Sequence, residues 1–415
     1  MEDVPHPMYE PRKFRLYPFH DQERELLSQQ DELRYLWNYA LGERVDAWRM
    51  EKRTVSYVDQ CRSLAKWRAY CPELGRIYGH VAQECLHRLD DAFKHFYRRC
   101  KQGEEPGYPR FKHEVASLTY PDSNGSSAIV PGRNGTKRLH LAMLGDIPIE
   151  MHRAPPEGRV KTCTVEREGD RWYAVLTYEV ADPESPPSTA PQKPAGVDLG
   201  ISSLATLSTG EKTEPPKFLQ KAEKRLKVAQ RDLSRKVKGS ANWHRQNVRV
   251  QRCHAKVRDQ RRDFAHKLTT RWAVTYDLIA FEDMDLRNHM QGAFPKPTAD
   301  AGWGILRQFS AYKERNRSGR YVEVPTKGTT QTCSGCGRLH DPPLTLKDRV
   351  YNCPCGLRLD RDINAARNVV ARALAIIGRG TPESTPVETR PPPHRKGRRV
   401  RSSKQEPPCA MGVAT

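Results

Sequence analysis

The chain has 415 residues, enough for roughly two to four domains of ordinary size. Its 71 Lys and Arg residues outnumber its 50 Asp and Glu residues, which gives a formal net charge of +21. This excess is larger than solubility requires, so the expected partner is a polyanion and not a membrane surface. On charge alone, a binding protein of the ribosomal or chromatin type remains a second interpretation.

Targeting signals and cysteine usage bear on the compartment. The amino terminus lacks the pattern of a secretory signal, and no run of about 18 apolar residues occurs. We therefore expect a cytoplasmic protein that associates with the nucleoid. In a reducing compartment the 11 cysteines are not expected to form disulfides. Cysteines at short spacing are then candidate metal ligands, and the dispersed ones are expected to be buried apolar side chains or idle thiols.

The first half of the chain predicts a helical domain inserted into a β domain. A short strand-like segment ends at Pro18, and residues 19–104 carry apolar side chains at spacings of three and four. Strand-like sequence with turn residues returns at 105–182, where two β-rich runs flank Gly169 and Asp170, a good hairpin turn. We expect residues 1–18 and 105–182 to form a small antiparallel barrel or sheet.

The second half of the chain predicts an α/β domain. Residues 183–194, rich in Pro and Ser, are predicted to be a linker. Two β-rich runs that turn at Thr209 and Gly210 follow, then a long helical hairpin that turns near Gly239, and then a short apolar strand. This order is compatible with an RNase H-like core. The tail, residues 378–415, has few aliphatic side chains and is predicted to be disordered and basic.

Three acidic residues at element ends are candidate metal ligands. Asp198 follows a short apolar strand, Glu282 closes another, and Asp362 stands at the start of a helix. Cleavage of a phosphodiester with two Mg²⁺ ions requires three or four converging carboxylates. Each residue also has a structural interpretation: a strand-end turn for Asp198, an exposed strand terminus for Glu282 and a helix cap for Asp362. Because Asp360 is available as the cap, Asp362 is left for a metal.

Four cysteines form the most specific local motif. The pairs Cys333 and Cys336, and Cys353 and Cys355, are separated by a short segment, and each pair is followed by Gly. This pattern predicts a tetrahedral structural Zn²⁺ site with no open position for catalysis. The second pair has one intervening residue in place of the usual two. Two residues between the pairs, His340 and Asp348, are therefore alternative ligands.

The segment from Lys217 to Arg271 is strongly basic. A merely solvated helix would alternate the two signs of charge, and this segment does not, which favours contact with phosphates. The candidate nucleic-acid contacts in it are Lys221, Arg225, Arg235, Lys236, Lys238, Arg245, Arg249 and Arg252.

In this order, the motifs resemble those of the TnpB family of transposon-encoded, RNA-guided nucleases, the relatives of compact type V CRISPR effectors. The resemblance covers nearly the whole chain. It rests on the segments Arg15–Pro18, Gly107–Lys112, Gly196–Gly200, Asp263–Thr269, Asp300–Gly304, Thr330–Gly337 and Asp360–Asn368.

The resemblance implies a multidomain α+β fold. A wedge-like β-barrel (1–18 and 105–182) would be interrupted by a helical recognition domain (19–104). A RuvC-like nuclease domain (195–330 and 358–377) would then be interrupted by a zinc ribbon (331–357) that contacts the target nucleic acid. The family's three RuvC carboxylates fall on Asp198, Glu282 and Asp362, and Tyr57 and Gln83 match positions that approach the flanking motif of the target.

The activity implied is that of an RNA-guided DNA endonuclease. Its partners would be a guide RNA, double-stranded target DNA and single-stranded DNA, and its cofactors two catalytic Mg²⁺ ions and one structural Zn²⁺. No membrane partner and no particular oligomeric state are predicted. An RNA-guided DNA-binding regulator that does not cut is the alternative, and a basic DNA-binding protein that needs no RNA is the third interpretation.

Overall fold

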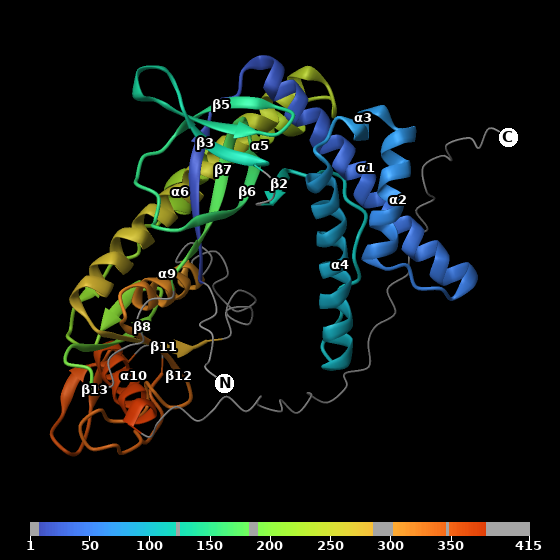
Figure 1. Ribbon diagram of the computed structural model, residues 1–415. Helices are drawn as coiled ribbons and strands as arrows, with labels where there is room; N and C mark the ends of the chain where they lie inside the picture. Colours follow the sequence, from blue (N-terminus) through green and yellow to red (C-terminus); the bar gives the residue numbers. More distant parts are fainter. Residues whose placement is uncertain (1–7, 122–124, 182–189, 285–301, 346–347, 379–415) are drawn as a thin grey trace.

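The computed structural model describes residues 8–121, 125–181, 190–284, 302–345 and 348–378. The tail that was predicted to be disordered lies outside these residues. Figure 1 shows three parts: a group of helices, a large antiparallel sheet beside it, and a smaller sheet with its own helices at the opposite end. In the described part of the chain, no helix combines the length and the apolar character that a bilayer-spanning segment needs.

The helical part occupies the region in which apolar residues recur at helical spacing. Its elements are α1 (His20–Glu51), α2 (Tyr57–Tyr70), the short α3 (Pro72–Gly75) and α4 (Gly79–Lys101). A capping box starts α2, because the Ser56 hydroxyl accepts the Asp59 N–H at 3.2 Å while the Asp59 carboxylate accepts the Ser56 N–H at 3.1 Å. Leu26, Leu86 and Leu89 are fully buried where the helices meet the large sheet.

The large sheet has seven antiparallel strands in the order β2-β6-β7-β1-β5-β4-β3. As predicted, β6 and β7 form a hairpin at Gly169, whose φ of +65° suits glycine. The bounds are β1 (Met8–Leu16), β2 (Ser117–Pro121), β3 (Ser127–Pro131), β4 (Lys137–Leu141), β5 (Gly145–Glu150), β6 (Arg159–Glu168) and β7 (Arg171–Val180), with a 3₁₀ turn at Arg133–Gly135.

The expected barrel is not closed. The edge strands β2 and β3 share no ladder among the described residues, although the Ser126 hydroxyl donates to the Pro121 carbonyl and brings the two edges close at one end. A closed barrel needs strand pairing all the way round. Here β1 pairs with β5 only through Arg15 and Leu16, so the β3-β4-β5 part can splay away from the rest. The sheet is therefore open and curled.

The smaller sheet has five strands in the order β10-β9-β8-β11-β12. Its central strands β8, β11 and β12 are parallel, and β9 and β10 are antiparallel additions that turn at Gly210. The bounds are β8 (Pro194–Leu199), β9 (Ala205–Leu207), β10 (Lys212–Thr213), β11 (Leu278–Asp283) and β12 (Arg320–Pro325). The predicted linker therefore ends one residue early, because Pro194 already begins β8, where a first strand residue needs no N–H.

Helices cover both faces of this sheet. The predicted helical hairpin consists of α5 (Phe218–Ser234) and α6 (Ala241–Thr275), and α6 together with α9 (Trp303–Asn316) packs on one face. On the other face lies α10 (Arg361–Gly378). Between β12 and α10 the chain forms the small hairpin of β13 (Val350–Asn352) and β14 (Arg358–Asp360). This arrangement is the mixed α/β core that the element order predicted.

Candidate active site, metal centre and nucleic-acid interface

Asp198 and Glu282 are neighbours at the carboxyl ends of two parallel strands. Val197 of β8 is in register with Phe281 of β11, so the next residue on each strand is Asp198 or Glu282. Side chains in register on adjacent strands point to the same face. For this pair it is the face that α10 covers, because Gly196, two residues before Asp198, lies directly against that helix.

Asp362 reaches the same place through the close approach of α10 to β8. A Cβ atom on Gly196 would lie 2.1 Å from the Ala366 carbonyl oxygen and 2.7 Å from the Val370 nitrogen. Only glycine allows this approach. Asp362 is one helical turn before Ala366 and therefore lies toward the end of the strand that carries Asp198. The structure thus brings the three predicted acidic residues to one edge of the sheet.

The surroundings of Asp198 are acidic as well as buried. Burial raises the pKa of Asp198 well above its usual value, and the negative charges of Glu282 and Asp362 raise it further. Arg361 opposes the effect and lies 3.5 Å from the Asp362 carboxylate. Like charges that share a partly desolvated site are costly unless a cation joins them. The cluster is therefore suited to metal cations.

The start of α10 is capped by Asp360, which leaves Asp362 free of that duty. The Asp360 carboxylate accepts the N–H groups of Asp362 at 3.0 Å and Ile363 at 3.3 Å, and it pairs with the Lys212 ammonium at 2.7 Å. Burial alone would raise the pKa of Asp360, but Lys212 and the helix N–H groups outweigh it and lower the pKa. Asp360 is therefore the helix cap, the role for which the sequence made it available.

The four cysteines form a compact cluster. Among the described residues they are the one group of possible metal ligands whose ligand atoms all lie within 4.8 Å of one another. The sulfur atoms of Cys333 and Cys355 are 3.7 Å apart, and those of Cys336 and Cys353 are 3.6 Å apart. A tetrahedral Zn²⁺ with bonds of about 2.3 Å separates its sulfur ligands by about 3.8 Å. The donor set therefore fits zinc.

The shortened Cys-Pro-Cys segment does not open the cluster. In each cysteine turn a glycine N–H donates to the carbonyl of the first cysteine at 2.9 Å: Gly337 to Cys333 and Gly356 to Cys353. Burial opposes ionisation of Cys333, but the N–H groups of Cys336 and Gly335 outweigh it and lower its pKa to about 7. Such a thiol is prepared to bind a metal as thiolate.

The two alternative ligands, His340 and Asp348, form other bonds in this structure. His340 Nδ1 lies 2.7 Å from the Pro342 carbonyl, and the Asp348 carboxylate accepts the N–H and the hydroxyl of Thr345, each at 2.7 Å. Neither residue belongs to the cysteine group. The cluster needs no substitute ligand, because the short turn still delivers both of its sulfur atoms.

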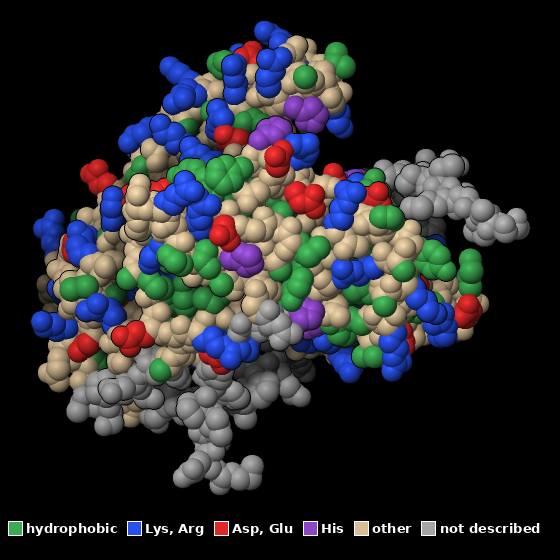
Figure 2. All heavy atoms as spheres, turned by 45° about the horizontal axis from the view of Figure 1, so that its top comes forward, with side chains coloured by type: hydrophobic (Ala, Val, Ile, Leu, Met, Phe, Trp, Pro, Cys, Tyr) green, Lys and Arg blue, Asp and Glu red, His purple; other side chains and the backbone are tan. Residues whose placement is uncertain are grey.

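The eight predicted basic contacts are all exposed on or beside the α5–α6 hairpin. Lys221, Arg225, Arg249 and Arg252 line a cavity of about 1130 Å³ between this hairpin and the turn of the β6–β7 hairpin. The remaining four, Arg235, Lys236, Lys238 and Arg245, lie at or near the turn that joins α5 to α6. Figure 2 shows Lys and Arg side chains spread over most of the face drawn, with fewer acidic ones among them.

Acidic residues of the β6–β7 turn already contact this basic helix. The Asp170 carboxylate accepts bonds from Arg252 Nε at 3.2 Å and Nη2 at 2.5 Å, and Glu168 pairs with Arg258 at 2.6 Å. Arg252 is thus engaged with the protein itself in this structure. These ion pairs fix the large sheet against α6.

Tyr57 and Gln83, the two residues matched to motif reading, lie near each other in the helical part. Tyr57 is the first residue of α2, and its ring packs edge-on against His87 of α4, with centroids 5.7 Å apart. Burial raises the pKa of Tyr57 to about 12. Gln83 is exposed one helical turn before His87, so the two side chains share one side of the helix pair.

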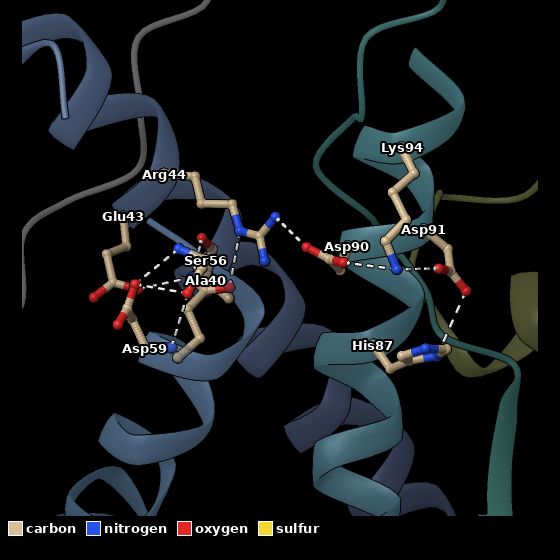
Figure 3. Close-up of polar contacts among 10 residues, drawn as sticks. Ala40, Glu43, Arg44, Ser56, Asp59, His87, Asp90, Asp91 and Lys94 are labelled. Carbon is tan, nitrogen blue, oxygen red and sulfur yellow. Dashed lines mark hydrogen bonds and ion pairs between the residues drawn. The ribbon is translucent and has the colours of Figure 1, made fainter. Parts of the chain in front are cut away.

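A buried polar network holds these helices in place. Arg44 of α1 donates to Gln60 of α2 at 2.9 Å and to Asp90 of α4 at 3.1 Å (Figure 3). Lys94 binds the other oxygen of Asp90 at 3.0 Å, and Asp91 lies 3.5 Å from the ring of His87. Because only 8% of the Arg44 side chain is exposed, these bonds are protected from water and fix α2 relative to α4.

Four residues without a clear sequence signal lie on α10 or against its first turn. Lys212 and Arg361 place two cations beside the acidic cluster, and Asn364 and Asn368 connect α10 to the first cysteine turn. Two amides four residues apart on an otherwise apolar helix face are a pattern that would have identified the asparagines.

Comparisons with known families match most of the chain. A family described as "Probable transposase" matches residues 175–292, a "Cas12f1-like, TNB domain" matches 303–369, and a "Helix-turn-helix domain" matches 8–53. In this structure the last of these segments forms strand β1 and the single long helix α1.

Relatives of similar length exist. A Streptomyces pristinaespiralis protein named "Putative RNA-guided DNA endonuclease" is 37% identical over 374 residues, which cover 88% of this chain and 89% of the relative. An Escherichia coli K12 protein with the same description, InsQ, is 29% identical and covers 89% and 93%.

A solved fold is similar as well. The structure of a Cas12f1–sgRNA–target DNA complex superimposes with a TM-score of 0.58 at 12% identity over 88% of this chain and 99% of that one, a likeness of fold. The identity to the Streptomyces relative, together with the transposase and TNB matches, shows that this chain belongs to the TnpB family.

Proposed function

We propose that this chain is an RNA-guided DNA endonuclease. The observation that carries the proposal is the convergence of Asp198, Glu282 and Asp362 at one edge of an RNase H-like sheet. The names of the two relatives that span nearly the whole chain support the same activity. The protein would act in the cytoplasm, where its DNA targets lie.

In this proposal the three acidic residues hold two Mg²⁺ ions. These ions would activate a water molecule and stabilise the leaving oxygen of the phosphodiester. Asp360, bound to Lys212, fixes the start of α10 and so orients Asp362.

The cysteine cluster would hold a structural Zn²⁺ and form the core of a small domain, residues 331–357, that contacts the target. With four sulfur ligands it has no open position, so no reaction step is assigned to it. Its contribution would be to keep the two cysteine turns and the β13–β14 hairpin folded.

The exposed basic residues would bind nucleic-acid phosphates. The cavity between the α5–α6 hairpin and the β6–β7 turn has a wall rich in Lys and Arg, so the guide RNA would lie along it. Tyr57 and Gln83 in the helical domain, residues 19–104, would approach the short motif beside the target, while base pairing supplies most of the specificity. The network around Arg44 would keep the helices of that domain in register.

One experiment tests the whole proposal. The chain is expressed with its native flanking DNA and purified, the bound RNA is sequenced, and the complex is incubated with Mg²⁺ and plasmids that carry randomised flanking motifs. A discrete RNA and Mg²⁺-dependent cuts beside one motif are the expected result. Bound RNA without cuts would favour the RNA-guided regulator, and specific DNA binding without RNA would refute the guided mechanism.

A further inference from the structure

Asn364 of α10 is bonded to the first cysteine turn on both sides of Cys333. Its side chain is completely buried. Its carbonyl oxygen accepts the N–H of Ser334 at 2.9 Å, and its amide nitrogen donates to the Thr332 carbonyl at 2.8 Å. One amide group therefore fixes the residues before and after a cysteine of the cluster.

Asn368 extends this contact along the helix. One turn later on the same face, its amide donates to the carbonyls of Thr329 at 2.8 Å and Thr332 at 2.6 Å. The neighbouring residues Ala365, Ala366 and Val369 are fully buried. A buried amide on an apolar face is costly unless it is fully bonded. The amide nitrogens of both asparagines and the carbonyl oxygen of Asn364 are bonded to backbone groups of the segment that contains the first cysteine turn.

The first turn of α10 is held from a second direction as well. The Arg361 N–H donates to the Arg349 carbonyl at 2.9 Å, and the Arg361 guanidinium donates to the Thr345 carbonyl at 2.8 Å. These bonds and those of Asn364 lie on either side of Asp362 in the sequence. On its sheet side the helix rests against Gly196. The position of Asp362 is therefore set jointly by the sheet and by the cysteine-containing segment.

We propose that Asn364 is a positioning residue for the acidic cluster: through Thr332 and Ser334 it holds Asp362 in place against Asp198 and Glu282. The segment with the cysteines is then part of the cleavage machinery and not only a surface for DNA. This inference rests on the proposed nuclease function. A buried asparagine could stabilise the contact of α10 with the cysteine-containing segment in general, or it could position Asp362 in particular. Asn368 makes similar bonds one turn farther from Asp362, so comparing the two asparagines separates these roles.

The test compares Asn364→Ala with Asn368→Ala in the full chain bound to its guide RNA. Single-turnover cleavage of a matched target is measured across a series of Mg²⁺ concentrations. Loss of a partner that orients a metal ligand typically costs about 10- to 100-fold in activity or metal affinity. We expect a loss of this size for Asn364→Ala, with a higher Mg²⁺ requirement, and less than about threefold for Asn368→Ala. RNA affinity and bound zinc should equal those of the wild type in both variants.

A second measurement does not depend on cleavage. Binding of Mn²⁺ to the protein is followed by electron paramagnetic resonance, with Asp362→Ala as the baseline. Weaker Mn²⁺ binding in Asn364→Ala than in Asn368→Ala supports the proposal even if the wild type cuts no target, an outcome that would refute only the nuclease function. Equal loss of Mn²⁺ binding in the two variants, or wild-type Mn²⁺ binding in Asn364→Ala, would overturn the positioning role of Asn364. If Asn364→Ala does not fold, Asn364→Ser, which keeps one hydroxyl, carries the same measurements.

Discussion

The two faces of the five-stranded sheet differ in the size of the side chains that pack against them. The face toward α6 and α9 is filled by large side chains, among them Trp272, Phe281 and Trp303. The face toward α10 has smaller residues, among them Ala280 and Ala373, and at Gly196 the backbones of strand and helix nearly touch. Large side chains hold layers together at ordinary distance, whereas small ones let a helix approach. Only the second arrangement brings an acidic residue of α10 to two strand ends.

Each side also buries a carboxylate, with a different outcome. Glu314 of α9 is 1% exposed, and neither of its oxygens has a hydrogen-bond partner among the residues that the structure describes. Burial raises its pKa to about 7. Burial also raises the pKa of Asp198, but Asp198 has two acidic neighbours, Glu282 and Asp362, that raise it further. Desolvation alone therefore does not mark a metal site, and the convergence of several carboxylates does.

The largest effect should follow neutralisation on the α10 face. Asp198→Asn or Asp362→Asn should lower the cleavage rate by more than about 1,000-fold, because a metal ligand is lost. The melting temperature in the absence of divalent metal should rise, since a buried like charge is removed. Cleavage assays and calorimetry measure the two effects. The matched control on the other face, Glu314→Gln, should cut at the wild-type rate. If Asp198→Asn still cleaved the target, the acidic residues on the α10 face would not be the active site.

Next in size is the pH dependence that Glu314 contributes. The pKa of Glu314 is about 7 in the folded chain and 4.5 when exposed, so its ionisation costs no stability below about pH 4.5. The cost grows as the pH rises and reaches about 3 kcal/mol above pH 7. Glu314→Gln should therefore stabilise the chain at pH 8 and much less at pH 5, as measured by urea unfolding. Equal effects at the two pH values would show that Glu314 does not titrate as proposed.

A moderate effect should follow from filling the close contact. Gly196→Ala forces β8 and α10 apart, and overpacking of this kind costs about 1 to 3 kcal/mol. Cleavage should fall as well, because Asp362 moves with the helix. The control is Gly42→Ala in α1, where the new methyl group meets no atom within 4 Å beyond its chain neighbours and the backbone of its own helix. It should stabilise the helix by up to about 1 kcal/mol. A Gly196→Ala variant with wild-type melting and cleavage would contradict the close packing.

The smallest effect is expected on the face with the large side chains. Trp272 is almost fully buried, and its indole N–H has no hydrogen-bond partner in the described part of the chain. In Trp272→Phe, lost packing is partly offset by removal of that N–H, so the variant should lose about 1 kcal/mol. Its cleavage rate at 25 °C should be unchanged. A large loss of cleavage would mean that both faces position the acidic residues.

Sequence patterns predict the local parts of the site well. Asp198 and Glu282 each lie near the carboxyl end of an apolar strand, and Asp360 caps the helix that Asp362 begins. These inferences need only residues a few positions apart. The cysteine cluster is of the same kind, because two short turns set the geometry of each pair.

Contacts between residues far apart in the sequence could not be predicted in this way. The close contact of Gly196 with Ala366 joins residues 170 positions apart, and a glycine within a strand has many other uses. The open edge of the large sheet depends on how β1 divides its pairing between β5 and β7. Glu314 stands among charged residues in the sequence and is nevertheless buried. A local sequence pattern cannot predict these contacts, because each depends on how elements distant in the sequence pack against one another.

The central place of β1 in the large sheet sets an order for synthesis on the ribosome. Met8 pairs with Val180, so the first strand made must wait for the last one. At about 5 to 20 residues per second that delay is on the order of 10 s. Helices α1 to α4 are translated during this time and can fold from local contacts. Slowing translation between residues 101 and 159 should therefore prolong the exposure of β1, whose Phe14 and Leu16 are buried in the folded chain, to other nascent chains.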